Sequence, residues 1–483
     1  MIRPTPLPTI VLLATLAADV AAQDILRSPQ TVQAAAYKFT ADDEQFLEEI
    51  QRGCFNYLWN EVGWPSGMAK DRRTTLVAST AGVGFQLSAI PIGVERGWIT
   101  REQGQARALS ILRTLMDRTD NRRDGVFLHF VQADDGGVYP PFHNEIATID
   151  HALLLAGALP AATYFGDEVA RLVQQMAAET NWRAFYSPDA QFISFAWIPK
   201  DHADLTGAGA LHALNWRVAS DEERLVYFLA TGCPTEQFAA DPRDYYRLER
   251  TLEAPDGDES SPLVVSVNGA LFTYFFAHCW IGYRSLEADD PRAFGVDAPR
   301  VDWFENSRRA VLAHRARCIE VADRYPTLAA DRWGLSPCMG YDQQGQINYL
   351  VPQIRPNLDD QEAWLGGVVA PYAAGSAIVF TPAESLAALR AFRDLRDAAG
   401  RPLVWRDPAR GGFAFADSFS LDPARACDDN VAIDVGPMIL SIENARTGLI
   451  WKLFGQHEIA RRAAKRLRFA KSGSLPTAAA AKE

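Results

Sequence analysis

The sequence lacks the short motifs that mark several large enzyme classes. Its 483 residues contain no glycine-rich phosphate-binding loop, no nucleophile elbow and no HExxH pair. The six cysteines form no CxxC pair, and the eight histidines have no zinc-ligand spacing. These absences argue against phosphate-loop, serine-hydrolase and zinc chemistry, and we expect neither a metal nor a cofactor.

Long apolar runs and a surplus of basic residues are also missing. No stretch reaches the ~18 consecutive apolar residues that indicate a membrane-spanning helix. Lys and Arg total 48 against 60 Asp and Glu, which gives a net charge of −12. This balance argues against nucleic acid or an anionic membrane as a partner. A neutral ligand fits the acidic balance better. We also expect a monomer or a weak oligomer.

The N-terminus has the pattern of an export signal. Arg3 precedes an apolar run over residues 10–18, and small residues then lead to Ala22. This order predicts a secretory signal over residues 1–22 and a periplasmic or secreted protein. The alternative is a frayed apolar N-terminus.

Helical periodicity recurs along most of the chain. Thr40 and Thr100 are placed to cap helices, and Ser220 and Thr381 each precede a glutamate at capping-box spacing. With 48% hydrophobic residues, the chain can bury a large core. The pattern predicts helices over 40–59, 101–117, 147–164, 166–181, 221–231, 266–285, 302–324, 382–396 and 437–454.

Clear period-2 alternation is scarce, and long loops rich in Gly, Pro, Asp and aromatic residues separate the helices. Loops of this length are usually functional. No flexible linker divides the chain, so we expect one all-α domain over 41–470, an (α/α)6 barrel of helix hairpins around a central cleft. A two-domain helical protein is the alternative. Residues 23–40 are interpreted as a linker and 471–483 as a disordered tail.

The segment HNEIATIDHALLLAG, residues 143–157, concentrates polar groups before an apolar helix. Cleavage of a glycosidic bond needs one carboxylic acid and one carboxylate. If the helix begins near Asn144, Glu145 lies in its first turn, where the helix dipole favours the ionised form that a base needs. Asp150 lies about 140° further round and points elsewhere. The alternative is that Glu145 only stabilises the helix start.

The segment SDEERLVYFLATG contains the second carboxyl candidate. Glu223 is occupied by the predicted capping box, which leaves Glu222 to face another direction. We predict that Glu222 is the general acid. A solvated first-turn glutamate is the alternative for this residue, and Asp221 remains open as a candidate.

Aromatic and charged residues in loops are candidates for substrate binding, because sugar rings stack on Trp and Tyr. Trp333 and Tyr341 lie in the glycine-punctuated loop DRWGLSPCMGY. His278 and Trp280 lie in FFAHCWIGYR, where a buried core histidine is the alternative. Asp71 and Arg72, in AKDRR, alternatively belong to a solvated loop, and Asp434 is interpreted as a helix cap.

Ten segments taken in order resemble the glycoamylase-type domain of the bacterial β-1,2-glucanases, glycoside hydrolase family 144. They span residues 44–468 and read FNYLWNE, AKDRR, GFQLSAIPIGVERGWIT, NEIATIDHALLLAG, SDEERLVYFLATGCP, FAHCWIGYR, DWFENSRRA, RWGLS, VVAPYAAGSAIVFTP and IDVGPMILSIENARTGLIW. The resemblance implies an (α/α)6 barrel, no metal, and hydrolysis of β-1,2-glucan with inversion. It also implies roles for Glu145, Glu222 and the Asp71–Arg72 pair.

The sequence departs from the family pattern at three places, which we expect near the rim of the cleft. They are Gly366-Gly367 in place of Asp-Gly, His151 in place of Thr, and Val435 in place of Gln. These changes leave two alternatives to hydrolysis of β-1,2-glucan or sophoro-oligosaccharides. One is a transglycosylase that acts on β-1,2-glucan or on a cyclic or modified glucan, and the other is a non-catalytic glucan-binding protein.

Overall fold

Helices are the main elements of the structure, a computed structural model that describes residues 37–141, 145–201, 204–255 and 262–471. The predicted signal (1–22) and residues 472–483 of the predicted tail lie outside these ranges. The helices are α1 (Ala41–Asn60), α2 (Thr80–Glu95), α3 (Arg101–Met116), α4 (Thr148–Phe165), α5 (Asp167–Glu179), α6 (Asp221–Gly232), α7 (Pro242–Tyr246), α8 (Trp303–Glu320), α9 (Pro371–Ser376), α10 (Pro382–Asp394), α11 (Ala432–Arg446), α12 (Leu449–Gln456) and α13 (Glu458–Arg466).

Short strands fill the long segments between the helices. They pair as antiparallel couples and one three-stranded sheet, β5-β6-β7, rather than as a central sheet. The fold is therefore helix-rich but not purely α. The strands are β1 (Val77–Ser79), β2 (Arg122–Arg123), β3 (Val126–Phe127), β4 (Phe130–Gln132), β5 (Ile146–Ala147), β6 (Ala196–Pro199), β7 (Gly209–Leu211), β8 (Leu252–Glu253), β9 (Leu263–Val264), β10 (Cys338–Tyr341), β11 (Ile347–Leu350), β12 (Trp405–Arg406), β13 (Ala414–Phe415), β14 (Ser418–Leu421) and β15 (Ala424–Cys427).

The capping signals place several helix starts correctly. Thr40 and Thr100 each close a capping box, with Asp43 and Gln103 respectively. The box predicted at Thr381 is wrong, because no side chain caps α10 and the Thr381 hydroxyl instead donates to the Ala377 carbonyl. The start of α10 therefore relies on Pro382 at its first position.

Two predicted helices are wrong in their extent. Residues 266–285 form three separate 3₁₀ turns, η3 (Leu271–Tyr274), η4 (Ala277–Cys279) and η5 (Tyr283–Ser285). One cause is tertiary, because the Ala277 N–H donates to the Asp221 carboxylate. The predicted helix 437–454 breaks into α11 and α12 at Gly448, whose φ of +70° ends the first helix.

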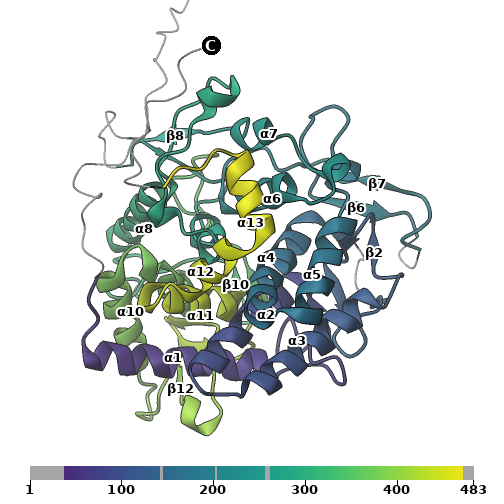
Figure 1. Ribbon diagram of the computed structural model, residues 1–483. Helices are drawn as coiled ribbons and strands as arrows, with labels where there is room; N and C mark the ends of the chain where they lie inside the picture. Colours follow the sequence, from purple (N-terminus) through teal and green to yellow (C-terminus); the bar gives the residue numbers. More distant parts are fainter. Residues whose placement is uncertain (1–36, 142–144, 202–203, 256–261, 472–483) are drawn as a thin grey trace, which may run out of the picture.

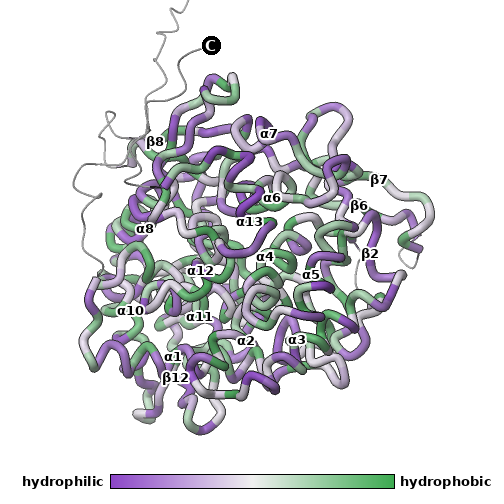
Figure 2. Tube along the Cα trace, viewed as in Figure 1, coloured by the Kyte–Doolittle hydropathy of each residue, from purple (hydrophilic) through white to green (hydrophobic). Residues whose placement is uncertain are grey.

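The sequence pattern missed α2 because this helix is buried on nearly all sides and so has no amphipathic period. It packs against α4, which is equally apolar. Gly84 and Gly157 lie at their contact, where a Cβ added to Gly157 would stand 1.8 Å from the Gly84 carbonyl oxygen. The two backbones therefore meet directly. Figure 2 shows apolar residues concentrated along these central helices.

Six elements contact one another in a closed cycle around the middle of the molecule. In order they are α11, α2, α4, α6, the η3–η4 segment and α9, and α9 returns to α11. The rings of Phe275 and Tyr372 meet edge to face at 6.1 Å and join the η3–η4 segment to α9. Figure 1 shows α2, α4 and α11 near the centre of the view, with α1, α3 and α8 nearer its edge. Most buried apolar residues form one continuous core.

Two expectations from composition hold for the described residues. Within these ranges, no helix is long and apolar enough to cross a bilayer. All six cysteines are buried and free, as expected for Cys54, Cys279 and Cys318.

The contact between α2 and α4 gives a stability prediction. Gly157→Ala should lower the free energy of unfolding by about 1–3 kcal/mol or more, because neither backbone can yield without moving a whole helix. The matched control is Gly455→Ala in α12, where an added Cβ meets nothing within 4 Å. We expect the control to be neutral or slightly stabilising. Urea unfolding measures both, and equal effects would contradict the direct contact of the two backbones.

Candidate active site

A cavity of about 500 Å³ lies where the elements of the central cycle begin. Each element contributes a residue near its own N-terminus, namely Ala81 (α2), Asp150 (α4), Glu222 (α6), Phe272 (η3), Tyr372 (α9) and Asp434 (α11). The positive ends of several helix dipoles therefore converge on one space. The remaining lining residues are Asp71, Arg72, Ser79, His129, Phe130, Ile149, Leu153, Phe276, Pro337, Tyr349, Val431 and Ile433.

Glu222 faces this cavity because both of its neighbours in sequence have other partners. Glu223 accepts a hydrogen bond from the Ser220 hydroxyl. Asp221 is fully buried and binds Arg224 and His278, with its Oδ2 2.9 Å from His278 Nδ1. Glu223 and Asp221 thus hold the first turn of α6 in place, and Glu222 lines the cavity.

Burial raises the pKa of Glu222 well above its usual value, and the carboxyls of Glu223, Asp150 and Asp221 raise it further. This shift favours the protonated form of Glu222. A protonated carboxyl beside a substrate cavity is the state that a general acid requires.

His129 brings Glu145 and Asp150 together, which the sequence did not predict. Its Nδ1 lies 3.1 Å from Glu145 Oε1, and its Nε2 lies 3.4 Å from Asp150 Oδ1. Asp150 therefore joins this cluster through His129, which belongs to a distant segment, because the helical period alone keeps Asp150 and Glu145 apart. Burial raises the pKa of Asp150 to about 6, although His129 opposes the shift.

Glu145 does not lie in a helical first turn. It precedes β5, and α4 begins three residues later at Thr148, with Ala147 as a cap that makes no side-chain bond. The dipole argument for an ionised Glu145 therefore fails. Glu145 contacts His129 but is not among the residues that line the cavity, whereas Asp150 is.

Two further carboxyls complete the polar lining. Burial raises the pKa of Asp71, although the Arg72 guanidinium, 3.2 Å away, and His129 both oppose the shift. Asp434 is not a helix cap, because α11 begins two residues earlier and has no side-chain cap. Burial and the neighbouring Asp417 raise its pKa well above the usual value. Both of its carboxyl oxygens are buried, and neither has a hydrogen-bond partner among the described residues.

The aromatic wall of the cavity differs from the predicted one. Trp280 and Trp333 are fully buried in the core, and Trp280 donates to the Ser88 hydroxyl. His278 is a buried partner of Asp221, so its core interpretation holds. Tyr341 packs against the Arg425 guanidinium and does not line the cavity. The lining aromatics are Phe130, Phe272, Phe276, Tyr349 and Tyr372.

Some of the missed residues carried a signal in the sequence. His129 lies in VFLHFVQ and Tyr349 in INYLV, both short stretches rich in β-branched and aromatic residues, as is typical of strands. Tyr349 pairs with Met339 across the β10–β11 hairpin, and 46% of its surface is exposed. Nothing in the sequence alone indicated that these two strands lie beside α4 and α6.

The three departures from the family pattern do not reach the cavity. His151 is buried, its Nε2 lies 2.9 Å from the Thr180 hydroxyl, and burial lowers its pKa to about 3. Val435 is also buried. Gly366 and Gly367 have φ of +83° and +68°, which favours glycine at both positions. None of the four residues is among those that line the cavity.

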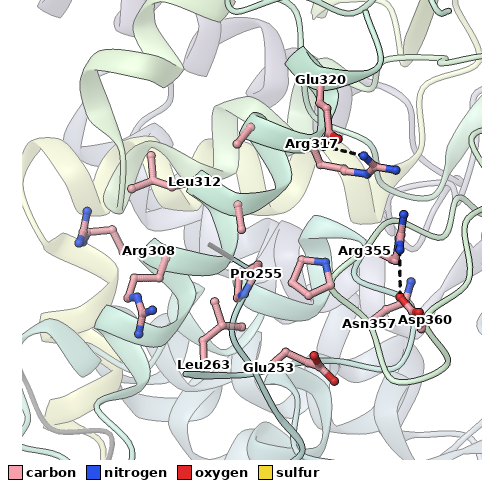
Figure 3. A pocket seen from close by; sticks show the side chains of 14 residues that line it. Glu253, Pro255, Leu263, Arg308, Leu312, Arg317, Glu320, Arg355, Asn357 and Asp360 are labelled. Atoms are coloured by element: carbon pink, nitrogen blue, oxygen red, sulfur yellow. Dashed lines mark hydrogen bonds and ion pairs between the residues drawn. The ribbon is translucent and has the colours of Figure 1, made fainter. Parts of the chain in front are cut away.

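A second cavity of about 700 Å³ lies beside α8 and is rich in arginine. Figure 3 shows Arg317 paired with Glu320, and Arg355 paired with Asp360. Arg308 pairs with Glu305. Each of these three arginines therefore has a carboxylate partner within the described part of the chain. Across the described ranges, no group of three or more His, Cys, Asp or Glu side chains could hold a metal.

The fold and the cavity together define a helix-rich protein with an acid–carboxylate site and an aromatic wall. A family model named Glycoamylase, described as "Putative glucoamylase", matches residues 214–458, slightly more than half of the chain. The chain therefore belongs to the glycoamylase family.

Individual relatives extend this likeness along the chain. An exo beta-1,2-glucooligosaccharide sophorohydrolase (non-reducing end) of Parabacteroides distasonis is 27% identical over 461 residues, 89% of this chain, which spans 58% of that protein's length. The crystal structure of a "putative glucoamylase" from Bacteroides uniformis is 25% identical with a TM-score of 0.73, covering 90% of this chain and 99% of that one. An endo-beta-1,2-glucanase from Chitinophaga pinensis, in complex with sophorotriose and glucose, shares the fold at 24% identity and a TM-score of 0.70, covering 89% and 99%.

The raised pKa of Asp434 gives a prediction for stability against pH. A carboxyl whose pKa is raised in the folded state binds more protons there than in the unfolded chain, so stability falls as pH rises above the unfolded value of ~3.9. Asp434→Asn removes this loss and should raise stability at pH 7 by about 0.5–2 kcal/mol.

The gain should vanish near pH 3.5, where the carboxyl is protonated in both states. Glu236→Gln is the matched control, because Glu236 is exposed. Its pairing with Arg466 lowers the pKa of its carboxyl. We expect a change within about 0.5 kcal/mol for the control. Thermal unfolding between pH 3.5 and 7.5 measures both variants, and a less stable Asp434→Asn at pH 7 would contradict the prediction.

Proposed function

We propose that this protein is a glycoside hydrolase that cleaves β-1,2-glucan or sophoro-oligosaccharides. The observation that carries the proposal is one cavity that is lined both by Glu222, whose pKa is raised well above its usual value, and by Asp150 and Asp71, which lie beside His129 and Arg72. Likeness to the Parabacteroides distasonis sophorohydrolase supports β-1,2-linked glucose as the substrate. The cavity volume of about 500 Å³ lies within the ~300–1,000 Å³ of small-molecule sites.

Glu222 is the general acid in this proposal. Its proton passes to the glycosidic oxygen as the bond from that oxygen to the anomeric carbon breaks. The buried Asp221–Arg224 pair behind it supports this role, because the Arg224 guanidinium lies 4.0 Å from the centre of the Trp303 ring and anchors the helix start. Glu222 thus needs little reorganisation to meet the leaving oxygen.

The general base in our proposal is Asp150 rather than the predicted Glu145. Asp150 lines the cavity, and with a pKa of about 6 it is ionised at neutral pH. It accepts a proton from water as the water oxygen bonds to the anomeric carbon. Attack on the face opposite the leaving group inverts the anomer and needs carboxyls ~6.5–9.5 Å apart.

Asp434 is the second candidate for the base, because neither of its buried oxygens has a partner. A buried polar group without a partner is expensive and is expected to bind a ligand or water. Burial and the neighbouring Asp417 favour its protonated form, so we assign it to a sugar hydroxyl. Tyr349 supplies an exposed aromatic face for the sugar ring.

The wider architecture and the site of action are part of the proposal. The closed cycle of six inner elements, with α1, α3, α5, α8, α10 and α13 packed outside, supports an (α/α)6 barrel. Residues 1–22 support export to the periplasm or beyond, although they lie outside the described part of the chain.

Replacing the carboxyls one at a time tests these roles. Glu222→Gln should lower kcat on linear β-1,2-glucan by a factor of about 10²–10⁴, because it removes the proton donor, while sugar binding persists. Asp150→Asn should cost a similar factor, whereas Glu145→Gln and Asp434→Asn should retain more activity. If Asp434→Asn is instead the most damaged and Asp150→Asn retains turnover, the base is Asp434. Normal turnover of Glu222→Gln would refute the acid assignment.

The products distinguish hydrolysis from its alternatives. We expect new reducing ends in proportion to bonds cleaved, and an initial product with the α anomer, because the β linkage is inverted. NMR of the anomeric protons during the first turnovers measures this ratio. Chain rearrangement without new reducing ends would indicate a transglycosylase, and binding without any product would indicate a glucan-binding protein.

A further inference from the structure

His129 touches two carboxylates at one wall of the cavity, and neither the acid nor the base role uses it. The two carboxylates flank β5, with Glu145 before the strand and Asp150 in the first turn of α4. The Glu145 contact is 3.1 Å at Nδ1, and the Asp150 contact is 3.4 Å at Nε2. One imidazole therefore contacts two carboxylates that lie on either side of β5 in the sequence.

The position of the His129 ring is fixed by three independent contacts. Its ring stacks on Phe130 with the centroids 3.9 Å apart. Its backbone N–H donates to the Glu145 carbonyl at 2.9 Å, and its carbonyl accepts from the Thr80 N–H at 2.9 Å. The backbone of His129 is thus tied to Glu145, just before β5, and to the first residue of α2.

The charge of His129 suits a bridge between carboxylates. Burial alone would lower its pKa, but Asp150, Glu145 and Asp71 outweigh burial and raise the pKa to about 9. These three carboxyls are the charged groups that face the ring, from α4, from the segment before β5 and from the loop before β1. As an imidazolium, His129 donates from Nδ1 to Glu145 and forms an ion pair with Asp150 through Nε2, and both contacts gain from the opposite charges.

We propose that His129 is a positioning residue that clamps the Glu145 and Asp150 carboxylates on the water-activating wall of the cavity. Its catalytic consequence rests on the proposed function, whereas the clamp itself is a property of the folded protein. Without the cation, Glu145, Asp150 and Asp71 would repel one another, and Asp150 would turn or take up a proton. His129 keeps its own protons throughout the reaction.

The first test compares pH profiles of kcat/KM for sophoro-oligosaccharides. His129→Gln keeps one amide donor but loses the charge, so neutral Asp150 is favoured and the acid limb near pH 6 should move up by about one unit. Activity at pH 6 should fall about fivefold, because the ionised fraction of Asp150 drops from about one half to about one tenth. His457→Gln, at the start of α13 and remote from the cavity, should leave the profile unchanged. A uniform loss at every pH, or no loss, would overturn the positioning role.

The second test needs no catalysis. The His129 imidazole is followed by NMR in the full chain labelled with ¹⁵N-histidine, and its signal is assigned by its absence from His129→Gln. We expect a titration midpoint near 9 in the wild type, and a lower midpoint in both Glu145→Gln and Asp150→Asn. A midpoint near the ordinary ~6.5 in the wild type overturns the clamp.

The two tests separate the clamp from the proposed function. A raised midpoint that both substitutions lower, in a protein that leaves β-1,2-glucan intact, supports the clamp and refutes the function. Hydrolysis with an ordinary midpoint refutes the clamp and leaves the function standing. His129→Phe tests whether a loss of folding explains the effects of changing His129. This variant keeps the stacking on Phe130 and should retain the wild-type melting temperature within a few degrees.

Discussion

Four carboxyl groups face one small and mainly apolar cavity, and this desolvation is the constraint on which the site depends. An ionised carboxylate taken out of water is costly unless a cation or hydrogen bonds compensate it. The protein divides the four into two kinds. Asp71 and Asp150 stand beside Arg72 and His129, whereas burial raises the pKa of Glu222 and of Asp434 well above the usual value. One residue type thereby supplies both a proton donor and proton acceptors, as carboxyl-based catalysis requires.

The rigid part of the fold keeps these groups from relaxing toward water. The starts of six inner elements converge on the cavity, and α2 and α4 meet backbone to backbone at Gly84 and Gly157. A wall built on such a contact cannot open without separating two buried helices. Behind Glu222, the buried Asp221–Arg224–His278 network plays the same part, because a broken buried ion pair would cost about 3–5 kcal/mol.

The sequence predicted what local physics decides. Helices with a cap and an amphipathic face, such as α1 and α3, follow from spacing alone, and so does the orientation of Glu222, because Glu223 has its own partner. Because α2 is buried on nearly all sides, its sequence shows no amphipathic period. The aromatic run before Tyr283 shows a helical period, although residues 266–285 form no continuous helix. The link between Asp150 and Glu145 could not be predicted, because the helical period of 3.6 residues compares positions on one helix. His129 makes the link from another segment.

The aromatic residues show why composition alone misplaces a sugar platform. Trp280 and Trp333 have large apolar side chains and are fully buried in the core. Their sequence motifs alone do not show whether such a side chain packs in the core or lines the cavity. The exposed ring is Tyr349, on a hairpin whose partner strand holds the predicted Tyr341. A glucose ring on Tyr349 would bring hydroxyls toward the unpartnered oxygens of Asp434. Substrate would then donate hydrogen bonds to a buried carboxyl whose oxygens lack a partner of ordinary geometry among the described residues, and these bonds would add to the binding energy.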